Sequence, residues 1–217
     1  MKGKEIIKRV IWRIIHFLEF KIIIKMDCHK LKSIIDIVFI MSEKIFSKLD
    51  ILLPVYIQYY QELIQTEIDL AQIAEKRTLL DVGSGSIPAS CILLAKKTNV
   101  KIVGIDKNPE SVKRSKKVLS RLNLEERVEI IDANAMNFPM NDFDIIIIAN
   151  GINPYYELLE RVSKDMRNDA TVIFRTFSHS NEELAQKDLF LKKFFIIGRK
   201  THHKKSGSLI SVLLHKK

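Results

Sequence analysis

From residue 77 onward, short apolar runs rich in β-branched residues alternate with segments of helical period. Runs with the strand pattern lie at 78–82, 101–106, 127–132, 143–150 and 171–177. Helical patterns lie between them, near 88–97, 109–122 and 154–166. A continuous apolar run such as Ile145–Ile148 is typical of a strand that is buried on both faces of a parallel sheet. The alternation therefore predicts an α/β fold with a doubly wound, mostly parallel sheet.

Two further strand patterns, 194–200 and 208–216, flank the polar segment "THHKKSG". A short polar connection predicts a hairpin, so the last of seven strands should run antiparallel to its neighbour. This ending distinguishes the predicted sheet from a plain dinucleotide-binding domain. We expect His202 and His203, in the hairpin loop, to be solvated. No metal site is predicted there, because adjacent histidines in an extended loop point apart.

Residues 4–75 contain no glycine and one proline, Pro54, and their apolar residues recur at spacings of three and four. This period predicts three helices, near 4–25, 30–49 and 54–75, the last opened by Pro54. The sequence therefore predicts two parts. Residues 1–76 form an N-terminal helical segment that caps the ligand cleft, and residues 77–217 form the α/β domain.

The chain of 217 residues has a formal net charge of +10. Such an excess favours anionic partners, although a composition rich in Ile and Lys gives the same excess without any such partner. Charged residues interrupt the apolar N-terminus, so no membrane span and no signal peptide are expected. Two scattered cysteines, Cys28 and Cys91, form no disulfide framework, and a reducing cytoplasm is expected. The sequence makes no prediction of oligomeric state.

The stretch "LLDVGSGSIPASCILLAKK", residues 79–97, holds the tight turn after the first predicted strand. Ligands of doubly wound sheets bind where the strands end. Gly83 and Gly85 allow positive φ and a close approach of the backbone. Pro88 is predicted to be the first residue of the next helix. Ile87 stands where a third glycine would favour a pyrophosphate, which argues against NAD and for a ligand without phosphate, such as S-adenosylmethionine.

Two acids end the next two predicted strands. Asp106 is placed to accept hydrogen bonds from both ribose hydroxyls of a nucleoside. Asp132, followed by the small Ala133, suits an adenine amino group and ring edge. The alternative for each acid is a strand-end cap or an acid of a turn.

The segments "LLDVGSG", "VGIDKNPESV" and "VEIIDANAMNFP", with the terminal hairpin, resemble the class I S-adenosylmethionine-dependent methyltransferases over residues 77–217. The resemblance implies that the turn cradles the methionine part of the cofactor and that Asp81 orients its amino group. It also implies ribose binding by the second acid and adenine binding by the third. The third glycine of that family's motif is missing here. The implied cofactor-binding residues are Asp81, Gly83, Ser84, Gly85, Asp106, Lys107, Asp132, Ala133 and Asn150.

The Gly-Ser-Gly-x-x-Pro pattern of the turn is similar to that of the nicotianamine synthase group. The tyrosine, leucine and glutamate spacing of Tyr60, Leu63 and Glu67 adds to this resemblance, as does Arg175 in "VIFRTFSH". Enzymes of this group use the same cofactor but transfer its aminobutanoyl (3-amino-3-carboxypropyl) arm to an amine. The resemblance thus leaves two reactions open, methyl transfer and aminobutanoyl transfer.

Glu67 and Tyr60 are the predicted catalytic residues. Glu67 lies in an otherwise apolar helical stripe, where an unpaired carboxylate is costly. It could take the proton of an attacking amine, which Tyr60 could position from the same helical face. The alternative is an ordinary ion pair of Glu67 with a lysine. In "ANGINPYY", Asn153–Pro154 is interpreted as a helix start, and Tyr155 or Tyr156 as a lining residue of the acceptor pocket.

The predicted function is that of an S-adenosylmethionine-dependent transferase acting on a small-molecule acceptor, with an amine expected. A second hypothesis is an RNA methyltransferase that uses the basic N- and C-terminal segments, although no aromatic-interleaved RNA motif accompanies them. A third is a protein that binds the cofactor without catalysis.

Overall fold

The computed structural model describes residues 53–73, 78–177, 180–203 and 209–217. Its two compact units are divided between Tyr59 and Tyr60. The described part of the first unit is one helix, α3 (Leu53–Tyr59), and the second unit holds the other described elements. The predicted helices 4–25 and 30–49 lie outside the described residues.

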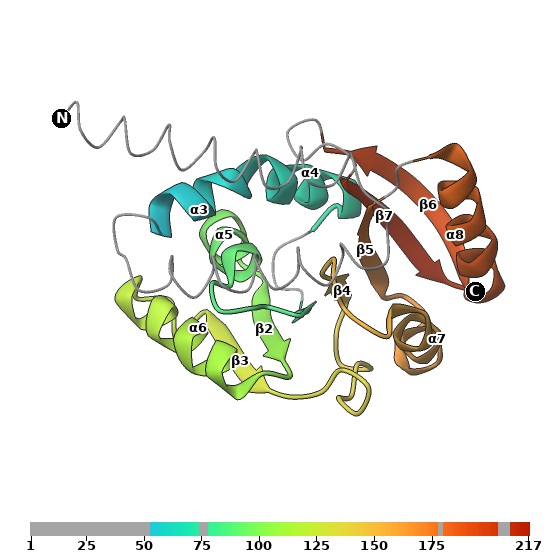
Figure 1. Ribbon diagram of the computed structural model, residues 1–217. Helices are drawn as coiled ribbons and strands as arrows, with labels where there is room; N and C mark the ends of the chain where they lie inside the picture. The colour runs from blue at the N-terminus through green and yellow to red at the C-terminus, as the bar shows by residue number, and fades with distance from the viewer. Residues whose placement is uncertain (1–52, 74–77, 178–179, 204–208) are drawn as a thin grey trace. The chain divides into compact units, whose positions relative to one another are not determined.

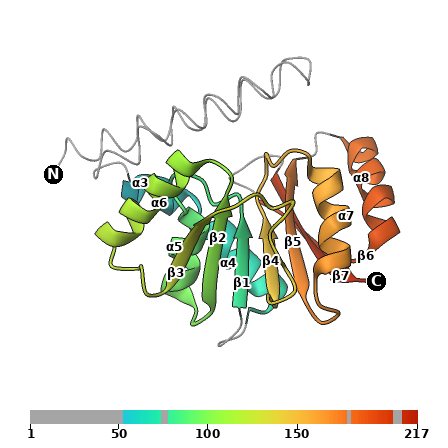
Figure 2. The ribbon, with the colours of Figure 1, turned by 90° about the horizontal axis from the view of Figure 1, so that it is seen from below.

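The second unit is built on a seven-stranded sheet in the order β3-β2-β1-β4-β5-β7-β6 (Figure 1 and Figure 2). The pairs among β1 to β5 are parallel, whereas β7 runs antiparallel to both β5 and β6. The strands are β1 (Thr78–Val82), β2 (Lys101–Asp106), β3 (Val128–Asp132), β4 (Ile145–Ile148), β5 (Thr171–Phe177), β6 (Phe195–His202) and β7 (Leu209–Lys216). The predicted mostly parallel sheet with an antiparallel hairpin is therefore confirmed.

Helices cover both faces of this sheet (Figure 2). On one face, α7 packs Leu158 and Val162 into an apolar core with Leu80, Ile146 and Val172 of the central strands. On the other face, α4 contacts α5 and strands β5 to β7, and α5 and α6 contact β2 and β3. The helices of this unit are α4 (Gln61–Ala71), α5 (Ala89–Lys97), α6 (Pro109–Arg121), α7 (Tyr155–Asp165) and α8 (Asn181–Phe194).

The predicted helix 54–75 is two helices in the structure. Tyr60 separates them, and its carbonyl accepts the first hydrogen bond of α4, from the Ile64 N–H at 3.0 Å. Helix α4 ends where Gln72 takes the left-handed conformation, with φ of 50°. The second unit begins at Tyr60, so α4 belongs with the sheet, whereas the sequence places it in the N-terminal segment. The role of residues 1–76 as a cap stays a prediction.

Helix α8 was not predicted. Leu191 is its one buried residue, so its apolar period is weak. A usable signal is nevertheless present, because the Ser180 hydroxyl accepts a hydrogen bond from the Glu183 N–H at 3.1 Å and so closes half of a capping box. Strand β4 is also shorter than its predicted range, 143–150.

Candidate cofactor site

The Gly-Ser-Gly turn follows β1 at the carboxyl edge of the sheet. Gly83 and Gly85 have φ of +83° and +70°, a region that L side chains rarely adopt. The N–H groups of Gly83 and Ser84 both donate to the Ile105 carbonyl, at 2.8 and 3.0 Å, which ties the turn to the end of β2. A Cβ at Gly83 would lie 3.1 Å from Ile152 Cδ1. The turn is therefore held at a backbone geometry in which a side chain at either glycine would be strained.

Pro88 is the N-cap of α5, so the helix begins at Ala89, one residue later than predicted. The φ and ψ of Pro88 are −78° and 64°, and its carbonyl accepts a hydrogen bond from the Ile92 N–H at 2.9 Å. Ile87 is 2% exposed, so the bulky side chain in place of a third glycine is accommodated in the interior. The turn thus opens directly into α5, as the sequence indicates.

Asp106, at the end of β2, is joined to the same turn. Its Oδ2 accepts a hydrogen bond from the Gly85 N–H, and its Oδ1 accepts one from the Asn108 N–H, both at 2.9 Å. Asp132 is the register partner of Asp106 in β3 and is exposed. Two carboxylates therefore stand side by side at the carboxyl edge, one fixed by backbone N–H groups and one open to solvent.

Of the other residues predicted for the cofactor, three flank this edge. Lys107 follows β2 and is exposed, and Ala133 follows β3, where its N–H donates to the Asp106 carbonyl at 3.1 Å. Asn150 lies beyond the end of β4 and is exposed. The structure thus gathers the predicted residues at the ends of β1, β2, β3 and β4.

Asp81 is the predicted site residue with the most unusual surroundings. It is 2% exposed, and its Oδ2 accepts a hydrogen bond from the Cys91 thiol at 3.1 Å. Its Oδ1 is buried and has no hydrogen-bond partner among the described residues. Burial raises the pKa of the Asp81 carboxyl above its ordinary value, and the positive charge of Arg175 opposes that rise. Burial and the nearby Asp81 raise the pKa of the Cys91 thiol, so it remains a protonated donor.

Glu67 of α4 is completely buried and forms an ion pair with Arg175 of β5. Arg175 Nε donates to Glu67 Oε1 at 2.8 Å, and Nη2 donates to Oε2 at 2.6 Å. Ser211 of β7 donates to Oε1 at 2.7 Å, and Arg175 Nη1 donates to the Ser90 hydroxyl of α5 at 2.9 Å. Glu67 therefore has an arginine partner rather than the lysine that the sequence suggested.

The polar chain continues to His203, which lies 2.8 Å from the Ser211 hydroxyl through Nε2. His203 is 4% exposed, so the prediction that it is solvated was wrong, whereas His202 is exposed. Burial lowers the pKa of His203, against the charge of Glu67. In the described part of the chain, no three His, Cys, Asp or Glu side chains gather where they could hold a metal ion.

The tyrosines that the sequence predicts near the acceptor lie at the starts of α4 and α7. Tyr60 is half-buried at the start of α4 and interacts electrostatically with Arg175. Pro154 is the N-cap of α7, which confirms the predicted helix start at Asn153–Pro154. The ring centroids of Tyr155 and Tyr156 lie 4.0 Å apart at the start of α7, and the Tyr156 side chain is 40% exposed.

Several residues of the polar network were not assigned a role from the sequence: Ser90, Cys91, His203 and Ser211. A signal was available for the network as a whole. Arg175 interrupts "TVIFRTF", a predicted strand of mostly apolar residues, and Glu67 interrupts an apolar helical stripe. Two opposite charges in apolar settings predict a buried pair, because an unpaired buried charge is costly.

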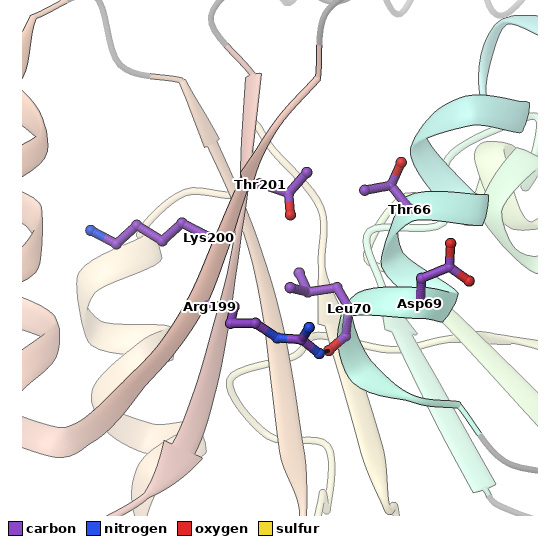
Figure 3. A pocket seen from close by; sticks show the side chains of 6 residues that line it. All are labelled: Thr66, Asp69, Leu70, Arg199, Lys200 and Thr201. Carbon is purple, nitrogen blue, oxygen red and sulfur yellow. Dashed lines mark hydrogen bonds between the residues drawn. The ribbon is translucent and has the colours of Figure 1, made fainter.

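A hollow of about 310 Å³ lies elsewhere, between α4 and the edge strand β6 (Figure 3). Arg199 reaches across it and donates to the Leu70 carbonyl at 3.0 Å, while Lys200 points away and pairs with Asp188. The strands β4, β5 and β7 separate β6 from the turn after β1. We therefore do not assign the cofactor to this hollow.

The residues at the carboxyl edge fit S-adenosylmethionine. The turn offers a backbone surface without side chains at Gly83 and Gly85. The unsatisfied Oδ1 of Asp81 is an acceptor that the cofactor's ammonium group would satisfy. Asp106 and Asp132 supply acceptors for a nucleoside.

Within the described residues, no helix is both long and apolar enough to cross a membrane.

Comparisons with known proteins agree with this assignment. Residues 73–206 match the family described as a methyltransferase domain. The chain is 25% identical over 120 residues to L-histidine 2-aminobutanoyltransferase of Yersinia pestis, which covers 55% of this chain and 45% of that protein. It is 30% identical over 121 residues to ajmaline N-methyltransferase of Rauvolfia serpentina, covering 54% of this chain and 40% of that protein. The chain thus spans less than half the length of either curated relative.

Two crystal structures show the same fold. A nicotianamine synthase variant in complex with S-adenosylmethionine has a TM-score of 0.70 at 17% identity, with 86% of this chain and 75% of that chain covered. A methyltransferase from Aquifex aeolicus that depends on S-adenosylmethionine has a TM-score of 0.59 at 21% identity, with 72% and 89% covered. The chain therefore has the class I methyltransferase fold and belongs to the methyltransferase-domain family, whose cofactor is S-adenosylmethionine.

Proposed function

We propose that this chain transfers a group from S-adenosylmethionine to a nitrogen atom of a small-molecule amine. The observation that carries the proposal is the buried Asp81 carboxylate beside the glycine turn, whose Oδ1 finds no hydrogen-bond partner within the described parts of the chain. The acceptor class is supported by the curated relatives, because one is by name an N-methyltransferase and the other an aminobutanoyltransferase of L-histidine.

In this proposal each residue at the carboxyl edge has a role. Asp81 accepts a hydrogen bond from the ammonium group of the cofactor, and Gly83, Ser84 and Gly85 lie along its methionine part. Asp106 accepts hydrogen bonds from the ribose hydroxyls. Asp132 and Ala133 border the adenine, and Lys107 and Asn150 flank the nucleoside and the reacting end.

Two reactions satisfy this arrangement. The amine nitrogen attacks either the methyl carbon or the methylene carbon of the aminobutanoyl arm, the carbon–sulfur bond breaks, and the electron pair remains on sulfur. The amine must attack in its neutral form, and the product nitrogen takes over the positive charge of the sulfonium, so an amine that arrives protonated has to release a proton before it attacks. Methyl transfer leaves S-adenosylhomocysteine, whereas aminobutanoyl transfer leaves methylthioadenosine, so the sulfur product distinguishes the two reactions.

The predicted role of Glu67 as the proton acceptor, with Tyr60 positioning the amine, stays a prediction. The Glu67 carboxylate accepts hydrogen bonds from Arg175 and Ser211 and is completely buried. Three of the four lone-pair directions of this carboxylate are thus occupied, and an amine would have to reach the remaining one inside the protein interior. The geometry therefore supports a positioning role for Glu67 more strongly than a role as base.

The RNA methyltransferase hypothesis is not favoured. Both curated relatives described above act by name on small molecules. Several cations of the basic C-terminal region also make internal contacts, since Lys216 donates to the Met166 carbonyl and Lys217 to the Lys192 carbonyl. The cytoplasmic location predicted from cysteine usage stays a prediction.

The proposal is tested by incubating the full chain with S-adenosylmethionine and a pool of small amines, including L-histidine, and measuring both sulfur products. We expect one of the two products to accumulate only when an amine is present. The matched control is Gly83→Val, which removes the cofactor cradle. Cofactor binding without either product in any amine pool would contradict the transferase proposal.

A further inference from the structure

Two carboxylates and one guanidinium group are buried together on the face of the sheet that α4 covers. Glu67, Asp81 and Arg175 are 0%, 2% and 5% exposed. In the register of the sheet, Asp81 stands beside Ile147 of β4, which stands beside Ile173 of β5. Because side chains alternate along a strand, Arg175, two residues after Ile173, emerges on the same face as Asp81. The two charges therefore share one low-dielectric space beneath α4 and α5.

The two carboxylates in this space are satisfied to different extents. Glu67 accepts hydrogen bonds from Arg175 Nε, Arg175 Nη2 and the Ser211 hydroxyl. From the residues that the structure describes, Asp81 accepts one hydrogen bond, at Oδ2, and its donor is the weakly donating thiol of Cys91. The third arm of Arg175, Nη1, goes to Ser90, the residue next to Cys91 on α5. Arg175 thus makes its contacts with Glu67 and Ser90, and its effect on Asp81 is through charge.

We propose that Arg175 is a positioning residue of the cofactor site, which keeps Asp81 ionised for the cofactor's ammonium group. Glu67 fixes the orientation of Arg175 and offsets part of its charge, and Cys91 holds Oδ2 of Asp81 so that Oδ1 is left for the ligand. This inference rests on the proposed function, because it assumes that Asp81 meets the ammonium group of S-adenosylmethionine.

The signs of the neighbouring charges determine the direction in which each substitution should move the pKa of Asp81. Arg175 favours the ionised form of Asp81, whereas burial and the negative charges of Glu67 and Asp106 favour the protonated form. Farther out, Tyr60 interacts with Arg175, and His203 interacts with Glu67. Only the ionised carboxylate attracts an ammonium group. The affinity for S-adenosylmethionine should therefore fall on the acid side as Asp81 takes up a proton.

The test is calorimetric titration of the full chain with S-adenosylmethionine at pH values from about 4 to 8, a range that brackets a carboxyl group with a raised pKa. Arg175→Met should move the acid limb to higher pH, and Glu67→Gln should move it to lower pH. We expect shifts of about one pH unit, which is about tenfold in affinity at a pH on the limb. Arg175→Lys, which keeps the charge, should shift it less than Arg175→Met.

The double variant Glu67→Gln/Arg175→Met provides a control for folding. It removes both charges, so no unpaired charge is left in the interior. Its acid limb should lie between those of the wild type and Arg175→Met. If Arg175→Met does not fold, Glu67→Gln and the double variant still test the inference, because their limbs should move in opposite directions from the wild type.

Methylthioadenosine is the matched ligand control, because it lacks the arm that carries the ammonium group. Its affinity should show no acid limb that moves with Arg175 or Glu67. Absence of binding by both ligands at every pH would overturn the proposed function, and with it this inference. Binding of S-adenosylmethionine with an acid limb that none of the variants moves would overturn the inference alone. An equal movement for methylthioadenosine would also overturn it.

A measurement without ligand reports on Asp81 directly. In a Cys28→Ser background, Cys91 is the chain's only thiol, and its S–H stretch absorbs in a part of the infrared spectrum free of other protein bands. An ionised acceptor lowers the S–H frequency more than a protonated one. The pH at which the band shifts should follow the same order: Glu67→Gln lowest, then wild type, the double variant and Arg175→Met. A band that is unchanged in Asp81→Asn would show that the thiol does not donate to Asp81, and would overturn the role of Cys91.

Discussion

Arg175 and Glu67, 108 positions apart in the chain, meet as a two-point ion pair with N–O distances of 2.8 and 2.6 Å in the interior of the sheet unit. The pair ties α4 to β5, and through Ser90 and Ser211 it also reaches α5 and β7. A buried pair adds little net stability, because desolvation offsets much of the attraction, but the loss of one partner leaves a charge uncompensated. The pair therefore fixes the placement of α4 on the sheet.

This asymmetry predicts a strongly non-additive mutant cycle. Arg175→Met leaves the Glu67 carboxylate buried with Ser211 as its remaining donor, and should lower the free energy of unfolding by about 3–5 kcal/mol. Glu67→Gln should be destabilising for the same reason. The double variant Glu67→Gln/Arg175→Met should recover a large part of this loss. Urea unfolding of the four proteins at neutral pH measures the cycle, and additive losses in the double variant would show that the two side chains do not act as a pair.

Substitution of Glu67 distinguishes a positioning role of this residue from a catalytic one. With Glu67 engaged by Arg175, we expect Glu67→Gln to lower the melting temperature, while turnover of the folded protein at saturating cofactor changes by less than about tenfold. A general base would instead cost about 10²–10⁴ in turnover. Turnover is measured below the melting transition of the variant, at neutral pH and above. A loss in the larger range, partly rescued as the pH rises, would establish Glu67 as the base.

The sequence predicted the sheet well because its signals are local. The apolar run Ile145–Ile148 and the turn at Gly83 and Gly85 each depend on a few neighbouring residues. Helix α8 was missed because most of its surface faces solvent, so it has no clear apolar stripe. The partner of Glu67 could not be read from spacing, since the strand order that brings β5 beneath α4 is a property of the whole sheet.

The glycine turn gives a prediction with a control in the same chain. Gly83→Ala places a Cβ at positive φ, at a strain of about 1–2 kcal/mol, and 3.1 Å from Ile152 Cδ1. We expect at least tenfold weaker binding of S-adenosylmethionine in calorimetry, with the far-UV spectrum unchanged. Gly198→Ala is the control, because a Cβ there is similarly tight, with contacts at 3.3 Å, but Gly198 has no positive φ and lies on the edge strand β6, away from the turn. Equal affinities of the two variants would show that the turn does not contact the cofactor.

Asp106 should be intolerant even of an isosteric change. Both of its oxygens accept hydrogen bonds from backbone N–H groups, of Gly85 and Asn108. In Asp106→Asn, the side-chain NH₂ group would therefore point at one of these N–H groups, and two donors would meet. Asp106→Ala removes the ribose acceptors and should weaken S-adenosylmethionine binding by about 1.5–3 kcal/mol. We expect Asp106→Asn to lose at least as much. The exposed Asp142→Ala is the control, and an Asp106→Ala variant that binds as tightly as this control would remove Asp106 from the site.

Substitution of Asp144 should change the stability of the fold without affecting the cofactor site. Asp144 lies just before β4 and joins the amino ends of two strands, because its Oδ2 accepts from the Thr78 N–H at 2.8 Å and its Oδ1 pairs with Arg167. Burial opposes ionisation, but these hydrogen bonds outweigh it and lower the pKa of Asp144 below its ordinary value. A carboxyl group with a lowered pKa stabilises the fold above its ordinary pKa, and this contribution is lost as the pH falls through the folded-state value. The free-energy gap between wild type and Asp144→Asn should therefore be largest above about pH 5 and narrow below about pH 4, as urea unfolding at each pH would measure. Affinity for S-adenosylmethionine at neutral pH should be the same in both proteins, since Asp144 stands at the opposite edge of the sheet from the turn. A gap that is constant with pH would show that the ionised carboxylate contributes nothing beyond what an amide provides.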